Sequence, residues 1–147
     1  MLCKFNLVGG QGRVKMNNRC YTYFRIVGKF NTDDISHILN LTPEKKWDIG
    51  DVRPNGSKYD FANWAIGYCK DYNIDTSVQM EKSISILMDK KEELKQIREK
   101  NDAEFYLQVV PILCVDESTP ALAPSMTVMD FCYETRTQID IDLYLED

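Results

Sequence analysis

Asp140 and Asp142 are the residues whose type and spacing come closest to a chemical site. Side chains two positions apart on a strand point to the same face, so these carboxylates could together hold Mg²⁺ or Ca²⁺. Glu146 or Asp147 could add oxygen ligands, and the site would then suit a metal-dependent hydrolase. We prefer the simpler interpretation, in which the acids form a solvated strand face and bind no metal.

Other catalytic arrangements find less support. The single histidine, His37, lies off the apolar stripe of its predicted helix, and the chain has no second imidazole. The chain has no nucleophile elbow of the Gly-x-Ser-x-Gly type. The glycine-rich segment 8–12 lacks the Gly-Lys-Ser/Thr that completes a phosphate-binding loop. We therefore expect a protein that is not an enzyme and that carries no cofactor.

A second group of residues could bind a partner instead. These residues are expected on the outward faces of strands: Tyr21, Tyr23, Arg25, Tyr106, Gln108, Asp140, Asp142 and Tyr144. Tyrosine buries area at low entropic cost and carboxylates attract basic partners, so this surface suits a basic protein. The tyrosines could also stack on single-stranded nucleic acid, but the acids and a net charge of −5 disfavour that partner. Cross-strand tyrosine pairs that only stabilise an exposed sheet are an equal alternative.

The predicted loop over residues 42–58 adds Trp47, Gly50 and Asp51 as candidates. Trp47 either fills the core or anchors a partner, and we favour the core. Gly50 and Asp51 could bind a ligand, but their types are more typical of a turn.

The elements that must position these residues follow from apolar periodicity. Strands are expected at residues 20–30, 59–69, 104–115 and 138–145, and helices at 31–42, 75–101 and 125–136. The segment 75–101 is expected to be one long helix, with Thr76 as N-cap and Gln79 completing a capping box. Its apolar stripe should cover a sheet: Met80, Ile84, Leu87, Leu94 and Ile97.

Alternation within the strands predicts which side chains are buried. Trp64, Ile66 and Tyr68 should share one face of the second strand, with Trp64 in the core. Pro111 should mark a bulge or an unpaired edge. The last strand should point four residues inward: Ile139, Ile141, Leu143 and Leu145.

The element order places two strand–helix–strand halves around the long helix. We therefore predict an α+β fold with a four-stranded, mainly antiparallel sheet and helices on one face. Its layout would be ferredoxin-like, βαβ-α-βαβ, with the long helix inserted.

Residues 16–147 are expected to form this single domain, and residues 1–15 an N-terminal extension outside it. Met16 could be the natural start of the protein; alternatively, residues 2–8 form a short extra strand. No apolar run reaches the length of a membrane span, and no secretion signal is evident. The five cysteines are scattered without a Cys-x-x-Cys pair, so we expect free thiols, no zinc site and a cytoplasmic protein.

From about Tyr21 to Tyr144 the chain resembles a bacterial and phage family called domain of unknown function 4279. The resemblance rests on Tyr23-Phe24-Arg25-Ile26-Val27-Gly28, Ile35 and Leu39, Leu41-Thr42-Pro43, Gly50-Asp51, Trp64, and Ile139-Asp140-Ile141-Asp142-Leu143-Tyr144. It implies a small cytoplasmic protein, and some similar families are immunity proteins against bacterial toxins.

The expected function is therefore that of a non-enzymatic cytoplasmic binding protein, of immunity or inhibitor type. It would mask a basic partner such as a toxin or an enzyme. The alternatives are a metal-dependent hydrolase that uses Asp140 and Asp142, and a single-strand nucleic-acid binder that uses the sheet tyrosines.

Overall fold

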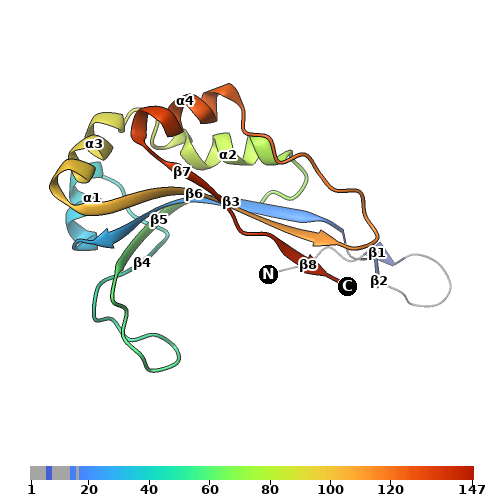
Figure 1. Cartoon of the computed structure of the whole chain (residues 1–147), viewed down its shortest axis with the longest axis horizontal. Helices are drawn as coiled ribbons and strands as arrows, with labels where there is room; N and C mark the ends of the chain where they lie inside the picture. The colour runs from blue at the N-terminus through green and yellow to red at the C-terminus, as the bar shows by residue number, and fades with distance from the viewer. Residues whose placement is uncertain (1–5, 8–13, 16) are drawn as a thin grey trace.

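The computed structural model describes residues 6–7, 14–15 and 17–147, which form one main sheet with helices on one of its faces (Figure 1). The helices are α1 (Thr32–Leu39), α2 (Thr76–Ser85), α3 (Lys91–Lys100) and α4 (Met126–Thr135). The main strands are β3 (Arg19–Lys29), β4 (Lys45–Trp47), β5 (Ala62–Cys69), β6 (Asp102–Cys114), β7 (Gln138–Ile141) and β8 (Tyr144–Glu146). The expected α+β class is thereby confirmed.

The strand layout differs from the predicted one. The order is β4-β5-β3-β6-β7, and β8 also pairs with β6. β3 is antiparallel to both β5 and β6, whereas β7 and β8 run parallel to β6. The predicted four-stranded, mainly antiparallel sheet of ferredoxin-like layout was wrong in its number of strands and in its layout, because β3 and β5 are direct antiparallel neighbours and α1 is not a crossover between parallel strands.

A short extra strand lies inside the predicted loop. β4 pairs with β5 through Lys45 opposite Ala65 and Trp47 opposite Asn63. Three residues, two of them lysine, carry too little alternation to be recognised as a strand from sequence.

The predicted long helix is two helices, α2 and α3, joined by a turn over residues 86–90. All five residues of the predicted apolar stripe are nevertheless buried, so the packing surface is continuous across the break. The N-cap of α2 is Asp75 and not Thr76, and there is no capping box. Instead, the Gln79 amide donates to the backbone oxygens of Cys20 at 2.6 Å and Asp71 at 2.9 Å.

The core lies between the sheet and the helices. Trp64 is fully buried there, as predicted, and its Nε1 donates to Ser36 Oγ at 2.9 Å. Phe24 contacts both Phe105 and Phe131, so β3, β6 and α4 meet in one aromatic cluster. Asn31 caps α1 and Ser125 caps α4, since each side chain accepts hydrogen bonds from backbone N–H groups of its helix. These contacts fix one face of the sheet against the helices.

The predicted C-terminal strand is broken into β7 and β8. Ile139 packs on the core, but the other three residues expected to point inward, Ile141, Leu143 and Leu145, are 46%, 48% and 73% exposed. Pro111 lies on β6 between Val109, which pairs with β7, and Ile112, which pairs with β8. Its missing N–H therefore coincides with an unpaired stretch of the edge, as predicted.

At the N-terminus, β1 (Asn6–Leu7) pairs with β2 (Val14–Lys15) in a separate two-stranded ribbon. β1 lies within residues 2–8, where a short strand was the alternative prediction; residues 1–5, 8–13 and 16, which include the predicted start Met16, are outside the described residues.

Candidate functional site

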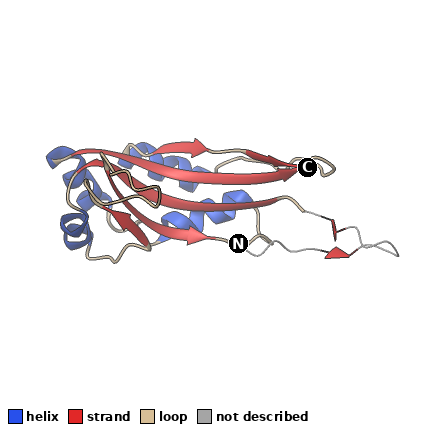
Figure 2. Cartoon of the chain, turned by 90° about the horizontal axis from the view of Figure 1, so that it is seen from below, coloured by secondary structure: helices blue, strands red, loops and turns tan. Residues whose placement is uncertain are grey.

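The helices cover one face of the main sheet and leave the other uncovered, and Figure 2 looks onto the uncovered face. We call it the open face. Hydrogen-bonded register places side chains on it in rows that cross the strands: Lys45, Ala65, Arg25, Tyr106 and Gln138 form one row, and Tyr23, Gln108 and Asp140 the next. Tyr21 lies opposite Val110, and Tyr144 is aligned with Ile112. Asp142, directly after β7, accepts a hydrogen bond from the Tyr144 hydroxyl at 3.0 Å. The structure thus brings all eight predicted strand residues together.

Tyr68 joins this face, although alternation predicted it beside Trp64 and Ile66. Its ring stacks on Tyr23 with centroids 4.4 Å apart, and Tyr23 in turn faces Tyr21 at 6.2 Å. The cause is a bulge in β5, where Gly67 and Tyr68 together lie opposite Tyr23.

A carboxylate holds the bulge in place. Glu44 Oε1 accepts hydrogen bonds from the backbone N–H of Gly67 at 2.8 Å and of Tyr68 at 3.1 Å. Gly67 has φ +75°, a conformation that favours glycine. Gly67 within an otherwise regular strand pattern was the sequence signal that could have indicated the bulge.

The acids of the open face are each bound by a different donor. Asp140 Oδ2 accepts from Gln108 Nε2 at 2.9 Å, and Glu104 accepts from the Tyr106 hydroxyl. Glu146 forms a two-point ion pair with Arg19, at 2.7 and 3.0 Å. Within residues 17–147 no three His, Cys, Asp or Glu side chains converge as a metal site would require. The carboxylates therefore lie apart along the β6–β7 edge, each with its own hydrogen-bond donor, and do not converge on one point.

Arg25 lies in the middle of the open face, with its guanidinium carbon 5.3 Å from the centroid of the Tyr106 ring. Its Nε is buried and has no hydrogen-bond partner among the residues that the structure describes. The Gln108 Oε1 atom, in the adjacent row, is likewise buried without a partner in that part of the chain. The centre of the face therefore retains unused hydrogen-bonding capacity.

The tyrosines of the stack stay protonated at neutral pH. Burial raises the pKa of Tyr21, of Tyr23 and of Tyr68, and neighbouring acids and tyrosines raise the pKa of Tyr68 further. Their hydroxyls are therefore hydrogen-bond donors and not phenolates. The face offers aromatic area with polar edges, which is the chemistry of a recognition surface.

The loop candidates lie at the β4 end of the sheet and in the turn that follows β4. Trp47 does not fill the core, which corrects our preferred interpretation: it is half-buried and stacks on Tyr59, with centroids 4.4 Å apart. Trp47 pairs with Asn63, two positions from the Lys45–Ala65 pair, so its side chain lies on the open face and not under the helices. Gly50 and Asp51 form the predicted turn, in which Asp51 Oδ2 accepts from the Asp48 N–H at 2.8 Å.

The described cysteines and the histidine have surroundings that do not favour nucleophilic catalysis. His37 is exposed on α1. Cys20, Cys114 and Cys132 are buried and, like Cys69, are free thiols; Cys3 lies outside the described residues. Burial raises the pKa of Cys132 to about 11 and also raises that of Cys20, which keeps both thiols protonated and unreactive.

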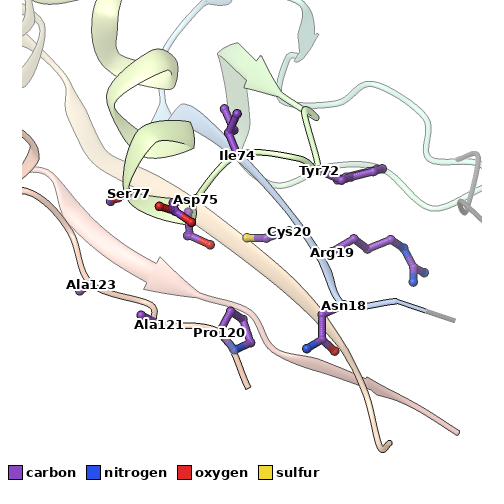
Figure 3. Close-up of a pocket in the computed structure, with 11 residues that line it drawn as sticks. Asn18, Arg19, Cys20, Tyr72, Ile74, Asp75, Ser77, Pro120, Ala121 and Ala123 are labelled. Atoms are coloured by element: carbon purple, nitrogen blue, oxygen red, sulfur yellow. The ribbon is translucent and has the colours of Figure 1, made fainter. Parts of the chain in front are cut away.

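A separate hollow of about 340 Å³ lies at the start of α2, bounded by β3 and the segment 120–123 (Figure 3). Cys20 points into it from β3, and Asp75 and Ser77 line it from α2. Asp75 is the N-cap residue of α2, and its carboxylate disfavours an anion at this helix end, although it makes no hydrogen bond to the helix; burial raises the pKa of the Cys20 thiol. This hollow therefore offers no evident chemistry.

The fold and the open face define a small α+β protein with a one-sided helical layer and an aromatic, polar sheet surface. A family model described as Domain of unknown function (DUF4279) matches residues 18–146, and the chain belongs to this family. No curated protein and no solved structure is significantly similar to the chain. In the described part of the chain, no helix has the length and apolar character to cross a bilayer.

Proposed function

We propose that this protein is a non-catalytic binding protein that holds a protein partner on its open face. The observation that carries the proposal is the stack of Tyr21, Tyr23 and Tyr68 on a sheet face that no helix covers. Tyrosine side chains that are already ordered by stacking lose little entropy when a partner covers them. The protonated cysteines and the isolated histidine support a function other than catalysis.

We further propose that the partner is basic, and that the protein acts as a cytoplasmic immunity or inhibitor protein that masks a toxin or an enzyme. Glu104, Asp140 and Asp142 line the β6–β7 side of the open face, and the net charge is −5. Charges at the rim of an interface speed the encounter with a partner of opposite sign.

The two alternatives have weaker support. A hydrolase would need Asp140 and Asp142 to share a metal, but their carboxylates accept hydrogen bonds from Gln108 and Tyr144 respectively. A nucleic acid could stack on the tyrosines, but its phosphates would be repelled by the acids beside them.

Site-specific photocrosslinking in the organism of origin tests the proposal. Benzoylphenylalanine would replace Tyr144, which is exposed on the open face, or Tyr133, which is exposed on α4. We expect the Tyr144 variant to give a discrete crosslinked protein that the Tyr133 variant lacks. That protein, once purified, should bind the wild-type chain. Identical crosslinking patterns from the two positions, or failure of the purified pair to bind, would contradict the proposal.

A further inference from the structure

The open face is not uniformly acidic, because two lysines, Lys45 and Lys70, lie on its β4–β5 side, whereas Asp140 lies on β7. There, a groove of about 600 Å³ is lined by Tyr21, Tyr23, Glu44, Lys45, Tyr68 and Lys70, and we call it the Tyr–Lys groove. It runs over β3, β5 and the start of β4, at the stack formed by the bulge. The groove is thus part of the face proposed to bind a partner, but its charge has the opposite sign from the β6–β7 side.

Both ammonium groups of the groove are available. Lys70 Nζ lies 5.9 Å from the ring centroid of Tyr21 and 5.6 Å from that of Tyr68, and Lys45 Nζ lies 5.6 Å from that of Trp47. Neither lysine forms an ion pair with any residue that the structure describes. Each therefore rests against aromatic rings and retains its charge for a ligand.

The remaining polar groups of the groove are mostly donors. The hydroxyls of Tyr21, Tyr23 and Tyr68 have no hydrogen-bond acceptor within residues 17–147, in contrast to those of Tyr106 and Tyr144. The exception is Glu44, but its Oε1 already accepts from two N–H groups of the bulge. The groove therefore combines two unpaired cations and three hydroxyl donors, with only one carboxylate, which is engaged in holding the backbone.

We propose that the Tyr–Lys groove binds the carboxylate of an acidic residue in an extended segment of the protein partner. This inference rests on the proposed function, since the same open face must hold that partner. An acid in the groove gains charge-assisted hydrogen bonds from the lysines and the tyrosine hydroxyls, while its aliphatic stem packs on the rings.

The surroundings of the groove favour a peptide over a polyanion. A nucleic acid that left the groove across the sheet would meet Asp140, Asp142 and Glu104, whereas a peptide can place a basic residue there. From β5 to β7 the sheet spans three strand spacings, about 14 Å, which an extended peptide covers in about four residues. The partner segment should therefore carry an acid and a base about four residues apart.

Selection from a displayed library of random twelve-residue peptides tests this inference. The targets are the wild-type protein, the variant Lys45→Gln/Lys70→Gln, and the control Lys82→Gln/Lys95→Gln, which removes the same charge from exposed positions of the helices. Near-ultraviolet circular dichroism first checks that each variant is folded. We expect the wild type and the control to enrich peptides in which Asp or Glu lies about four residues from Lys or Arg.

Affinities of the selected peptides, measured by fluorescence anisotropy, give the decisive comparison. We expect Lys45→Gln/Lys70→Gln to weaken binding about tenfold, and the amide form of the peptide's acid to weaken binding of the wild type but not of this variant. Peptides without an enriched acid, or peptides that bind both proteins equally, would overturn the inference. So would competition by 1 mM inorganic phosphate or by a twelve-residue oligothymidylate at the same lysines, because the occupant would then be a free anion or a nucleic acid.

The same measurement separates this inference from the proposed function. If the affinity of the peptides is unchanged in Lys45→Gln/Lys70→Gln but falls in Asp140→Asn/Asp142→Asn, the groove is not the binding site. The proposal that the open face binds a partner would still hold. A library that yields no peptide sensitive to any open-face substitution would reject both.

Discussion

Tyr23 on β3 and Tyr68 on β5 stack with their ring planes 7° apart, because the bulge at Gly67 turns Tyr68 from the core side to the open face. Regular alternation would have placed Tyr68 on the same side as Trp64 and Ile66, under the helices. The candidate binding surface thus depends on one local irregularity. Two features maintain it: the backbone conformation of Gly67 and the carboxylate of Glu44.

Gly67→Ala should destabilise the fold. A Cβ at this position would lie 2.1 Å from the backbone oxygen of Ser83 on α2, in addition to the strain of φ +75°. We expect a loss of at least about 2 kcal/mol in the free energy of unfolding, measured by urea denaturation. Gly50→Ala is the matched control, since Gly50 has φ +90° but nothing within 4 Å of its Cβ position; it should cost about 1 kcal/mol. Equal losses would show that packing against Ser83 does not matter.

Glu44→Ala should loosen the stack without unfolding the protein. The substitution leaves the N–H groups of Gly67 and Tyr68 without their acceptor. Because Glu44 is exposed and water can replace it, we expect a loss of only about 1 kcal/mol. The near-ultraviolet circular dichroism of the tyrosines should weaken, and Glu44→Gln, which keeps an oxygen acceptor, should restore it. An unchanged spectrum in Glu44→Ala would mean that Gly67 alone sets the bulge.

Trp64→Ala and Trp47→Ala should differ strongly in stability. Trp64 is fully buried and hydrogen-bonded to Ser36, so its truncation leaves a large cavity and should cost about 3–5 kcal/mol. Trp47 is half-buried against Tyr59 on the hairpin, and we expect its truncation to cost less than about 2 kcal/mol. Chemical denaturation of both variants checks the difference. Similar values would mean that Trp47 supports the core after all.

Helical periodicity and strand alternation predicted the helix-covered side of the protein well. The stripe over α2 and α3 is buried as predicted, yet the break between them was missed, because the turn over 86–90 preserves the spacing of the apolar residues. The strand order could not be obtained from local patterns, since pairing depends on contacts between distant segments. The edge at β7 and β8 was misjudged because alternating isoleucine and leucine residues do not by themselves report which face is covered.

The open face was only partly predicted, and the limits have the same physical causes. β3 and β6 pair without interruption, so alternation placed Tyr21, Tyr23 and Tyr106 on one side correctly. Tyr68 was missed because the bulge reverses the alternation of β5. Lys45 and Lys70 were missed because they lie on a three-residue strand and just beyond a strand end, where alternation carries no information.

Glu146→Gln should make stability less dependent on pH in the acidic range. Arg19 donates two hydrogen bonds to the Glu146 carboxylate and thereby lowers the pKa of this group. A carboxylate whose pKa is lower in the folded than in the unfolded state contributes stability above its unfolded pKa, about 4.3, and loses it as pH falls through the folded value. We therefore expect the wild type to be more stable than the variant at pH 7, by a margin that shrinks below about pH 4. Urea midpoints of both proteins at pH 7, 4 and 3 check this, and a constant margin would contradict it.

Asp140→Asn/Asp142→Asn should change association and leave the fold intact. Both residues belong to the open face, away from the core, and an asparagine oxygen can still accept from Gln108 and from the Tyr144 hydroxyl. The melting temperature should therefore stay within about two degrees of the wild type. A larger drop would mean that these carboxylates are needed to attach β7 and β8 to the sheet.

The effect of these two charges on binding can be measured with the partner recovered by photocrosslinking. The double Asn variant should associate more slowly, and its association rate should depend less on salt, because rim charges act mainly on the encounter. Tyr23→Ala should instead speed dissociation, since an ordered aromatic anchor contributes about 2 kcal/mol or more to a complex. Glu92→Gln/Glu99→Gln removes the same charge from exposed positions of α3 and should change neither rate constant. Stopped-flow association at several salt concentrations separates these effects, and a partner whose kinetics respond to the α3 variant but not to the open-face variants would place the interface on the helices.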